Sequence, residues 1–481
     1  MTIEELHKEI DRQWEKHLSE TRRILRVPSV SFTGEGIEET AALMEELLDD
    51  MGATHGQFKG SKKSWPLVTG TLDVGADKTA LMYGMYDVQP AGDLGLWDTP
   101  PFAAKIVKNK RFGDVVVARG AYNSKGSLVG TLLAMKTMVD KGEMPMNVKF
   151  LLEGEEELGG LSLPRYIYKN KATLSKADVA LGMDYMENAK GVPVLSFGLK
   201  GCVYFDLITD GKYQGGPENE IHSSDAVWVQ SPVWRLIKAL STMVNENQVP
   251  TVDGLWDNVK KPSKEDQGLI RKLAGRLDLE SYKRELGVKD FNATGTKEEL
   301  ITKYLFEPSL NICGLDAGYN GEGTKTVLPS HAMAKIDIRL VPDMTVEDTN
   351  KKVHAHLARR GFTDIQVRHY EDYPLSKVSV SEDISKASIQ AMKYHGKDPE
   401  IWPMVAGSAP FYLFNDVLGI PWGGAGLGHG GNAHAPNEFA VIKGMKDFEK
   451  SVITTLWTYD EITKRRKRRG RKSYTARSLT D

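Results

Sequence analysis

The sequence predicts an α/β protein: a main domain with a central, largely parallel sheet flanked by helices, into which a separate α+β domain is inserted. Three observations predict this architecture. The chain has 481 residues, of which 40% are hydrophobic and 27% charged, enough for a large core and more than one domain. Up to about residue 200, short apolar runs alternate with helical patterns, as in layered α/β proteins. The pattern then changes, and the first pattern resumes near Pro374.

The first segment opens with a helix within residues 1–28 and continues with alternating strands and helices. Apolar residues three or four apart predict the opening helix: Ile3, Leu6, Ile10, Trp14 and Leu18. The same spacing predicts a later helix face: Leu128, Leu132, Met135 and Val139. Apolar runs predict strands at residues 79–83, 115–118, 148–152 and 179–183. In such sheets ligands bind at the loops that follow the carboxyl ends of the strands.

The inserted domain is predicted at residues 203–374. It is expected to contain an edge-type strand at 203–209, a helix at 231–244, a charged and loop-rich stretch at 245–295, and strands at 332–341 and 363–370. A helix at 384–394 and strands near residues 401 and 420 return to the first pattern. The predicted main domain therefore consists of residues 1–202 and 375–461.

Residues 462–481 form a basic tail that we predict to be flexible. The tail carries nine Lys or Arg and one Asp, a net charge of +8, whereas the whole chain carries −2. Eight of the nine residues 464–472 are basic, and so dense a block of like charge cannot bury itself. A solvated tail is the first interpretation. An anionic partner, such as nucleic acid, a membrane surface or an acidic patch on another subunit, is the alternative.

Composition excludes several classes of protein. The chain has only two cysteines, Cys202 and Cys313, which excludes a disulfide framework and a Cys-rich zinc site and fits a reducing compartment. No run of about 18 apolar residues predicts a transmembrane helix. The N-terminus lacks the basic-then-apolar pattern of a signal peptide. We therefore expect a cytoplasmic protein that does not bind membranes through its body.

Acidic and imidazole side chains follow the predicted strands. The stretch Glu-Gly-Glu-Glu-Glu-Leu-Gly-Gly at residues 153–160 comes directly after an apolar strand. Adjacent Glu156 and Glu157 can divide two roles, with one coordinating a cation and the other acting as a general base near metal-bound water. Asp184 ends the next strand, and His434 lies in a Gly-rich loop. Each motif alone is also compatible with a solvated loop, but the motifs follow one another in a familiar order.

This order resembles the M20 family of di-metal peptidases and amidohydrolases, and within it the carnosinase-like dipeptidase branch. The resemblance covers nearly the whole chain. Its motifs are Gly84-Met85-Tyr86-Asp87, Trp97-Asp98-Thr99-Pro100-Pro101-Phe102, the Glu-Gly-x-Glu-Glu-x-Gly loop, Ile221-His222-Ser223 and Asn432-Ala433-His434-Ala435-Pro436-Asn437-Glu438. The resemblance implies that the inserted domain serves as a lid and as the dimerisation domain of a homodimer.

The resemblance also implies roles for the residues at the strand ends. Glu156 matches the general base, and Glu157 and His434 match ligands of the second metal. Asp184 matches a ligand of the first metal. Asp87 matches the carboxylate that orients a histidine ligand two residues earlier.

In the inserted domain, the resemblance implies a site for a small substrate with a carboxylate. His222 matches a histidine that reaches across the dimer to polarise the substrate carbonyl, and Thr326 and Arg339 match contacts to the substrate carboxylate. Ser408 lies in a segment that resembles the family's Gly-Gly-Ser-Ile-Pro. Asn123 occupies the position of the family's bridging aspartate; we count it with the substrate-binding residues and also as a possible neutral amide-oxygen ligand of the second metal.

Three departures from the family pattern put the metal site in question. Met85 stands where the first metal has a histidine ligand, Asn123 replaces the bridging aspartate, and Val405 stands where dipeptidases carry a glutamate for the substrate ammonium. Two divalent cations would meet only the carboxylates of Asp184 and Glu157. The lost bridge also removes the group that holds two cations about 3.5 to 4 Å apart. We therefore expect no dinuclear site, while one zinc or manganese ion and a metal-free pocket both stay open.

The leading hypothesis is an M20-type hydrolase that cleaves an amide bond in a small carboxylate-bearing substrate, either an N-acyl amino acid or a dipeptide-like molecule. One alternative is a metal-independent isomerase, racemase or lyase that uses Glu156 and His222 for proton transfer. The other is a non-catalytic binding homologue. The presence of Glu156, His222 and Arg339 argues against complete loss of the site.

Overall fold

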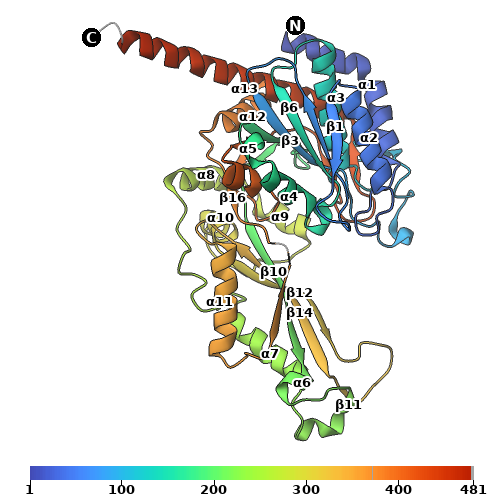
Figure 1. Ribbon diagram of the computed structural model, residues 1–481, viewed down its shortest axis with the longest axis vertical. Helices are drawn as coiled ribbons and strands as arrows, with labels where there is room; N and C mark the ends of the chain where they lie inside the picture. Colours follow the sequence, from blue (N-terminus) through green and yellow to red (C-terminus); the bar gives the residue numbers. More distant parts are fainter. Residues whose placement is uncertain (371, 478–481) are drawn as a thin grey trace. The chain divides into compact units, whose positions relative to one another are not determined.

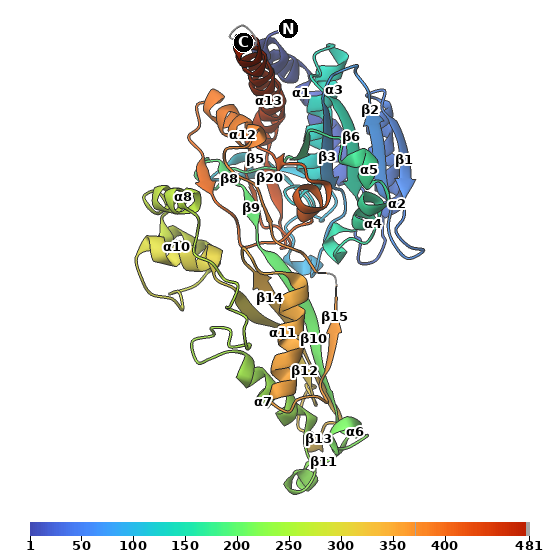
Figure 2. The same cartoon turned by 60° about the vertical axis from the view of Figure 1, so that its left-hand side comes forward.

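The computed structural model describes residues 1–370 and 372–477, except for the side chains of residue 285 and of residues 467–477. The chain folds into two compact units (Figures 1 and 2). The first unit consists of residues Met1–Phe197, Val378–Ile401 and the chain from Leu413 onward, and the second of Gly198–Lys377 and Trp402–Tyr412. Residues 402–412 thus join the second unit. The domain boundaries at residues 202, 374 and 461 stay predictions.

The first unit is built around a six-stranded sheet. Its strands, in spatial order, are β1 (Thr54–Phe58), β2 (Leu67–Leu72), β6 (Asn147–Glu153), β3 (Thr79–Met85), β7 (Val179–Gly182) and β18 (Trp422–Gly423). The four strands from β6 to β18 are parallel neighbours, whereas β1 and β2 join the sheet in antiparallel fashion. The predicted α/β architecture is confirmed, and its parallel strands end at one edge of the sheet.

A second sheet in this unit is antiparallel. It contains β19 (Gly430–Gly431), β20 (Phe439–Val441), β5 (Gly113–Val117) and β4 (Lys105–Asn109). The strand that we predicted at residues 115–118 is β5, and it joins this sheet rather than the central one. The reason is local, because a short hairpin after Asn109 makes β4 and β5 antiparallel neighbours.

Helices pack on the central sheet and share one core with it. The opening amphipathic helix is confirmed as α1 (Ile3–Leu25), whose N-terminus has a capping box between Thr2 and Glu5. α1, α3 and α13 contact one another, and α2 covers β1 and β2. The remaining bounds are α2 (Ile37–Asp49), α3 (Lys125–Asp140), α4 (Ser162–Lys169), α5 (Lys171–Leu174), α12 (Asp383–Tyr394), α13 (Ile442–Arg477), η1 (Leu94–Leu96), η2 (Glu156–Leu158) and η4 (Leu413–Leu418), with β8 (Val194–Ser196) paired to β17 (Glu400–Trp402). None of the helices that the structure describes combines the length and apolar composition needed to cross a membrane.

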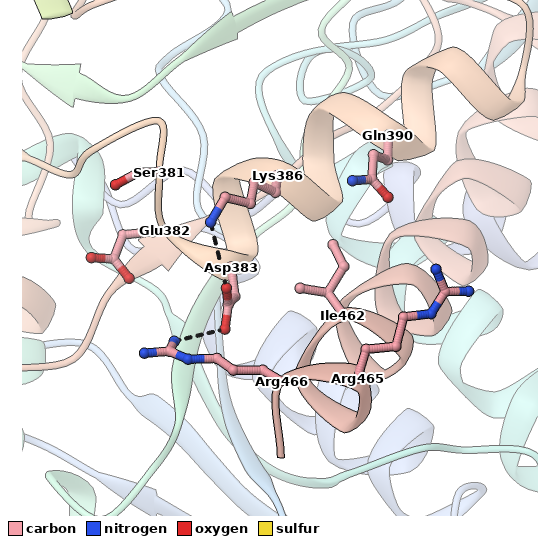
Figure 3. A pocket seen from close by; sticks show the side chains of 8 residues that line it. All are labelled: Ser381, Glu382, Asp383, Lys386, Gln390, Ile462, Arg465 and Arg466. Atoms are coloured by element: carbon pink, nitrogen blue, oxygen red, sulfur yellow. Dashed lines mark hydrogen bonds and ion pairs between the residues drawn. The ribbon is translucent and has the colours of Figure 1, made fainter. Parts of the chain in front are cut away.

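The last helix, α13, carries the basic residues at its end. Figure 3 shows Arg466 of α13 pointing toward α12, where it pairs with Asp383 at 3.0 Å. Within α13, Lys464 pairs with Asp460, one helical turn before it, at 2.6 Å. A pair four residues apart, such as that of Asp460 and Lys464, stabilises a helix in a charged segment. The backbone of residues 462–477 continues α13, whereas the sequence predicts a flexible tail there. The last four residues of the tail lie outside the described ones.

The second unit has a four-stranded antiparallel sheet in the order β12 (Ser309–Ala317), β14 (His331–Leu340), β10 (Gly201–Asp210) and β15 (Gln366–His369). Strand β10 lies between β14 and β15, so the expectation of an edge-type strand at residues 203–209 is wrong. The polar side chains of β10 lie on the face of the sheet that points away from the core. One of them, Asp206, accepts a 3.0 Å hydrogen bond from Arg368 on the neighbouring strand β15. Apolar Phe205 and Leu207 point into the core instead.

The other elements of the second unit are helices on this sheet and short strand pairs. Helices α7 and α11 pack on the core face of the sheet. The bounds are α6 (Gly211–Gln214), α7 (Pro232–Met243), α8 (Lys264–Ala274), α9 (Leu279–Leu286), α10 (Lys297–Phe306), α11 (Val346–Arg359) and η3 (Ser223–Val227), with β11 (Ile221–His222) paired to β13 (Val327–Leu328) and β9 (Gly198–Leu199) to β16 (Ser376–Lys377). Residues 245–295, which the sequence predicts as loop-rich, therefore contain two helices. Ser263 and Asp278 cap them through side-chain hydrogen bonds that charge and polarity alone do not reveal.

Candidate active site

The parallel strands of the first unit bring the strand-end residues to one edge of the sheet. β3 pairs in register with β6 from Thr79 to Met85, whose partner is Glu153. On its other side, β3 pairs with β7 up to Tyr83, whose partner is Gly182. The loops after β3, β6 and β7 therefore start side by side. They carry the motifs that the sequence analysis singled out.

Asp87 holds the loop that carries the two adjacent glutamates. Its buried carboxylate accepts hydrogen bonds from the backbone N–H groups of Glu156, at 3.1 Å, and Glu157, at 3.0 Å. Burial raises the pKa of Asp87 to about 7, against the opposing effect of a hydrogen bond from Ser31. Asp87 thus positions the backbone of this loop, whereas the resemblance implies that it orients a histidine.

Glu156 is the candidate proton acceptor. Its carboxylate makes no hydrogen bond with any of the described side chains or backbone groups, so it is available to a substrate or water. Burial raises the pKa of Glu156 to about 8, and the nearby carboxylates of Glu157 and Asp87 add to this rise. A carboxylate of raised pKa is a stronger base than an exposed one, as general base catalysis requires.

Glu157, His434 and Asn123 converge on one point. His434 Nε2 lies 3.0 Å from Glu157 Oε1, and Asn123 Nδ2 lies 3.0 Å from Glu157 Oε1 and 2.8 Å from His434 Nε2. The hydrogen bond with Glu157 raises the pKa of His434. The second oxygen of Glu157 accepts a 3.0 Å hydrogen bond from Gln89, a residue that the sequence analysis did not single out.

Ser124 connects this cluster to Asp184. Its hydroxyl lies 3.3 Å from Asn123 Oδ1 and donates to Asp184 Oδ2 at 3.1 Å. Burial raises the pKa of Asp184 to about 6, against hydrogen bonds from Ser127, Tyr185 and Ser124. Asn123 therefore stands between Asp184 and the pair formed by Glu157 and His434, where the family has a carboxylate. Ser124 heads α3 without a capping hydrogen bond of its own, because its hydroxyl is used in the site.

Glu438 anchors the loop that presents Asn123. Its fully buried carboxylate accepts hydrogen bonds from the backbone N–H groups of Gly120, Tyr122 and Asn123 at 2.9 to 3.1 Å. The other oxygen pairs with the buried Arg119 at 2.6 Å. One carboxylate thus fixes the backbone of a whole turn. Glu438 lies within one of the motifs that carry the family resemblance, but its position in the sequence alone predicted no role for it.

His434 lies in a loop with an unusual backbone. Three non-glycine residues within it have positive φ angles: Asn432 at 59°, His434 at 61° and Asn437 at 59°. Asparagine and histidine adopt the left-handed region more often than most other non-glycine residues, but this conformation is still uncommon and costs free energy. The loop keeps His434 in this conformation and directs its ring toward Glu157. Such local strain is typical of functional sites.

Two side chains at this edge, Glu157 and His434, are of the types that ligate divalent cations. Within the described ranges, no three His, Cys, Asp or Glu side chains form a group able to hold a metal ion. Glu157 and His434 nevertheless place an oxygen and a nitrogen 3.0 Å apart, beside the amide of Asn123. A carboxylate and an imidazole are ordinary zinc or manganese ligands, and water completes the shell of a catalytic site. At the first metal position, the thioether of Met85 offers a poor ligand.

Within the second unit, the predicted residues form two pairs. His222 lies at the end of β11, where its Nε2 is 3.2 Å from Thr326 Oγ1 and its Nδ1 is 2.8 Å from Ser224 Oγ. Arg339 on β14 donates to Ser408 Oγ at 3.0 Å, and Ser408 donates to the carbonyl of Lys200 at 2.7 Å. Both pairs contain the residues that the resemblance assigns to substrate binding.

These two pairs lie toward opposite ends of β14. The strand starts at His331, close to Thr326, and Arg339 lies eight residues further along it. At about 3.3 Å per residue, this separation is about 26 Å. Figure 1 shows β11 at one end of this sheet. The two pairs of one chain therefore cannot both contact one small substrate.

A hollow elsewhere in the first unit contains none of these residues. It has a volume of about 640 Å³ and lies between α12 and α13 (Figure 3). Its walls are charged and polar, with Asp383, Lys386 and Arg466 among them. None of the predicted catalytic, metal-binding or substrate-binding residues lies there.

Comparisons with known proteins agree with the resemblance. A family model described as "Peptidase family M20/M25/M40" matches residues 81–456. The Cys-Gly metallodipeptidase DUG1 of Candida albicans is 30% identical over 74% of this chain and 73% of its own. The Beta-Ala-His dipeptidase of Rattus norvegicus is 30% identical over 64% of this chain and 61% of its own.

Solved structures are similar as well. The structure of an M20 family metallo-carboxypeptidase, Sso-CP2 from Sulfolobus solfataricus, has a TM-score of 0.85 and 34% identity, and covers 92% of this chain and 99% of that chain. The dipeptidase Dug1p from Saccharomyces cerevisiae has a TM-score of 0.79 and 25% identity, and covers 96% of this chain and 99% of that chain.

Proposed function

Because the chain belongs to peptidase family M20/M25/M40, we propose that it hydrolyses the amide bond of a small substrate with a free carboxylate, a dipeptide or an N-acyl amino acid. The observation that carries this proposal is the unpaired Glu156 carboxylate beside the cluster of Glu157, His434 and Asn123. Glu156 accepts the proton of the attacking water and passes it to the leaving amine. Asp87 keeps Glu156 in place through its backbone.

Glu157 and His434 would hold one divalent cation, zinc or manganese. When bound, such a cation polarises the scissile carbonyl and lowers the pKa of water. The relatives named as metallodipeptidases support metal binding. A single ion is proposed because Met85 and the neutral amide of Asn123 replace two of the family's ligands.

Arg339 and Ser408 would bind the substrate carboxylate. The guanidinium of Arg339 is half-exposed, with Nε held by Asp337 at 2.8 Å and Nη1 at Ser408. This arrangement leaves guanidinium N–H groups for a carboxylate. Val405 offers no charge to a substrate ammonium, so an acylated or otherwise uncharged amine end fits this pocket better than a free amino group.

A homodimer would complete the site, because Arg339 lies about 26 Å along β14 from the end of the strand near which the His222 and Thr326 pair lies. His222 of the partner subunit can then meet a substrate bound by Arg339. The second unit offers surfaces for such a dimer: β12 is an edge strand with exposed Ile312 and Leu315, and Trp228 is 80% exposed. A second copy of the chain is the partner that a self-complementary site requires.

Mixing two inactive variants tests this arrangement. Glu156→Gln removes the base, and His222→Ala removes the group supplied to the partner's site. If His222 acts across the dimer, half of the dimers reassembled from an equal mixture carry both variants, and each of these has one intact site. We expect the mixture to regain about a quarter of the wild-type turnover, measured after denaturation and refolding together.

Each variant refolded alone is the control and should stay inactive. A mixture with no more activity than the separate variants would show that Glu156 and His222 act within one chain. That result would contradict the two-subunit site without affecting the assignment of Glu156.

Restoring the family's ligands tests the metal proposal. The double variant Met85→His and Asn123→Asp should bind about two zinc or manganese ions per subunit, whereas the wild type binds about one. The added imidazole and the anionic bridge provide what the first position lacks. Metal content is measured by elemental analysis after dialysis. The single Met85→His variant is the matched control and should stay near one ion, and two ions in the wild type would refute a mononuclear site.

Relatives named as dipeptidases favour hydrolysis, so we propose neither metal-independent proton transfer nor a purely binding role. The anionic partner that is the alternative interpretation of the basic tail, residues 462–481, stays a prediction, because the side chains beyond Arg466 lie outside the described ones.

A further inference from the structure

The helical part of the second unit encloses a cavity that the proposed hydrolysis does not use. Its volume is about 160 Å³. The walls are mostly apolar and aromatic and come from α9, α10, the loop between them and the end of β17: Leu277, Leu279, Tyr282, Phe291, Leu300 and Trp402. A cavity of about 150 Å³ with apolar walls accommodates one benzene ring. The space therefore fits a molecule with a single aromatic ring.

Two polar groups on the cavity walls lack partners. Trp402 is 8% exposed, and its indole N–H has no hydrogen-bond acceptor among the described residues. Leaving a buried N–H unpaired costs about 1–3 kcal/mol, so native structures rarely do so without a reason. Lys303 on α10 also lines the cavity, and its ammonium forms no ion pair with a described side chain. An acceptor that carries negative charge would satisfy both groups.

The cavity is connected to the residues proposed to bind the substrate carboxylate. Trp402 begins the segment 402–412, which also carries Ser408. From the other side, α10 leads directly to Glu307, whose carbonyl accepts a 2.7 Å hydrogen bond from Lys200 Nζ. The carbonyl of Lys200 in turn accepts the hydroxyl of Ser408, which Arg339 contacts. Small shifts of α10 therefore reach Ser408 through Glu307 and Lys200, and shifts of Trp402 reach it along their common segment.

We propose that this cavity is a regulatory site for a small aromatic carboxylate with one ring. The ring occupies the space between α9, α10 and Trp402, and the carboxylate takes the indole N–H and the ammonium of Lys303. Binding orders Trp402 and α10, and this changes the affinity of the Arg339 and Ser408 pair for substrate. The kinetic part rests on the proposed function, whereas binding to the cavity does not.

Phenylacetate, with benzyl alcohol as its uncharged counterpart, is the probe for binding. The full chain is labelled with 5-fluorotryptophan, and the fluorine signal of Trp402 among nine tryptophans is assigned by its loss in Trp402→Phe. We expect phenylacetate to shift this signal and to bind at least tenfold tighter than benzyl alcohol. Isothermal titration should show binding weakened about tenfold in Trp402→Phe and in Lys303→Gln. Leu300→Trp, which fills the cavity, should abolish it.

Matched controls are Trp234→Phe and Lys272→Gln, which change the same residue types at exposed positions and should bind phenylacetate normally. Arg339→Ala separates the cavity from the substrate site: the Trp402 signal should still shift in this variant. No shift of that signal, or equal affinity in Lys303→Gln and the wild type, would overturn the proposal. So would a shift that disappears in Arg339→Ala, because phenylacetate would then bind as a substrate analogue.

The regulatory effect is read from the KM of the wild type with and without saturating phenylacetate. We expect a change of threefold or more in KM that Leu300→Trp does not show. An unchanged KM despite cavity binding would remove the regulatory role. An enzyme without hydrolytic activity would leave the binding results standing and would contradict the proposed function alone.

Discussion

Glu156→Gln is expected to lower turnover by about 10² to 10⁴-fold while the protein stays folded and still binds its substrate. The glutamine amide has the same shape but cannot accept the proton of the attacking water. The Glu156 carboxylate has no hydrogen-bond partner within the described part of the chain, so its loss breaks no structural contact. Single-turnover kinetics measure the chemical step, and calorimetric titration with a non-cleaved amide analogue measures binding.

The neighbouring Glu155 is the matched control, because its role is structural. Its carboxylate accepts backbone hydrogen bonds from Trp65, Leu161 and Ser162 at 2.6 to 2.9 Å. Glu155→Gln should therefore lower the free energy of unfolding by about 1–3 kcal/mol and leave turnover per folded molecule within a fewfold of wild type. Full turnover in Glu156→Gln would contradict the assignment of the base.

Glu438→Gln should produce the largest loss of stability, about 3–5 kcal/mol in the free energy of unfolding. The substitution leaves the buried Arg119 without its counter-charge, and breaking a buried ion pair by removing one partner has this magnitude. It also weakens three hydrogen bonds to the backbone of residues 120–123. Urea denaturation followed by circular dichroism measures the loss. Because this turn presents Asn123, turnover of the folded fraction should fall as well.

Asp447→Asn is the control for a lost charge that is not buried. Asp447 pairs with Lys443 at 2.9 Å, but the lysine side chain is 85% exposed. Exposed pairs contribute about 0 to 1 kcal/mol, so this variant should unfold at nearly the wild-type urea concentration. Equal losses in the two variants would contradict the special role of Glu438.

The regular elements followed from hydrophobic spacing with few errors. The opening helix, the parallel strands β3, β6 and β7, and the long strands β10 and β14 lie where the apolar periodicity predicts them. Strand β10 was predicted as an edge strand, but β14 and β15 pair with it on both sides, and its polar Asp206 is buried, with a hydrogen bond from Arg368 on the next strand. The alternation of apolar and polar residues along a strand shows which face of the strand is polar. It does not show which neighbouring strand or side chain covers that face.

The sequence predicted which side chains belong to the site, but it did not predict which of them contact one another. Glu156, Glu157, Asp184 and His434 belong to quoted motifs, and the structure places Glu157 and His434 in contact. The partners Gln89, Ser124 and Glu438 were missed as functional residues. Each of them is a common polar side chain whose importance comes from a contact across 60 or more positions of the chain.

The sequence alone determined the α/β class, the family resemblance and the presence of Met85 and Asn123 within the family's motifs, because these depend on residue types in a linear order. Folding decided three further matters: that Asn123 stands between Asp184 and Glu157, that Asp87 holds the backbone of the glutamate loop, and that Trp402 lines a cavity with α9 and α10. These depend on strand register and long-range packing, which join residues far apart in the chain and leave no periodic trace in it.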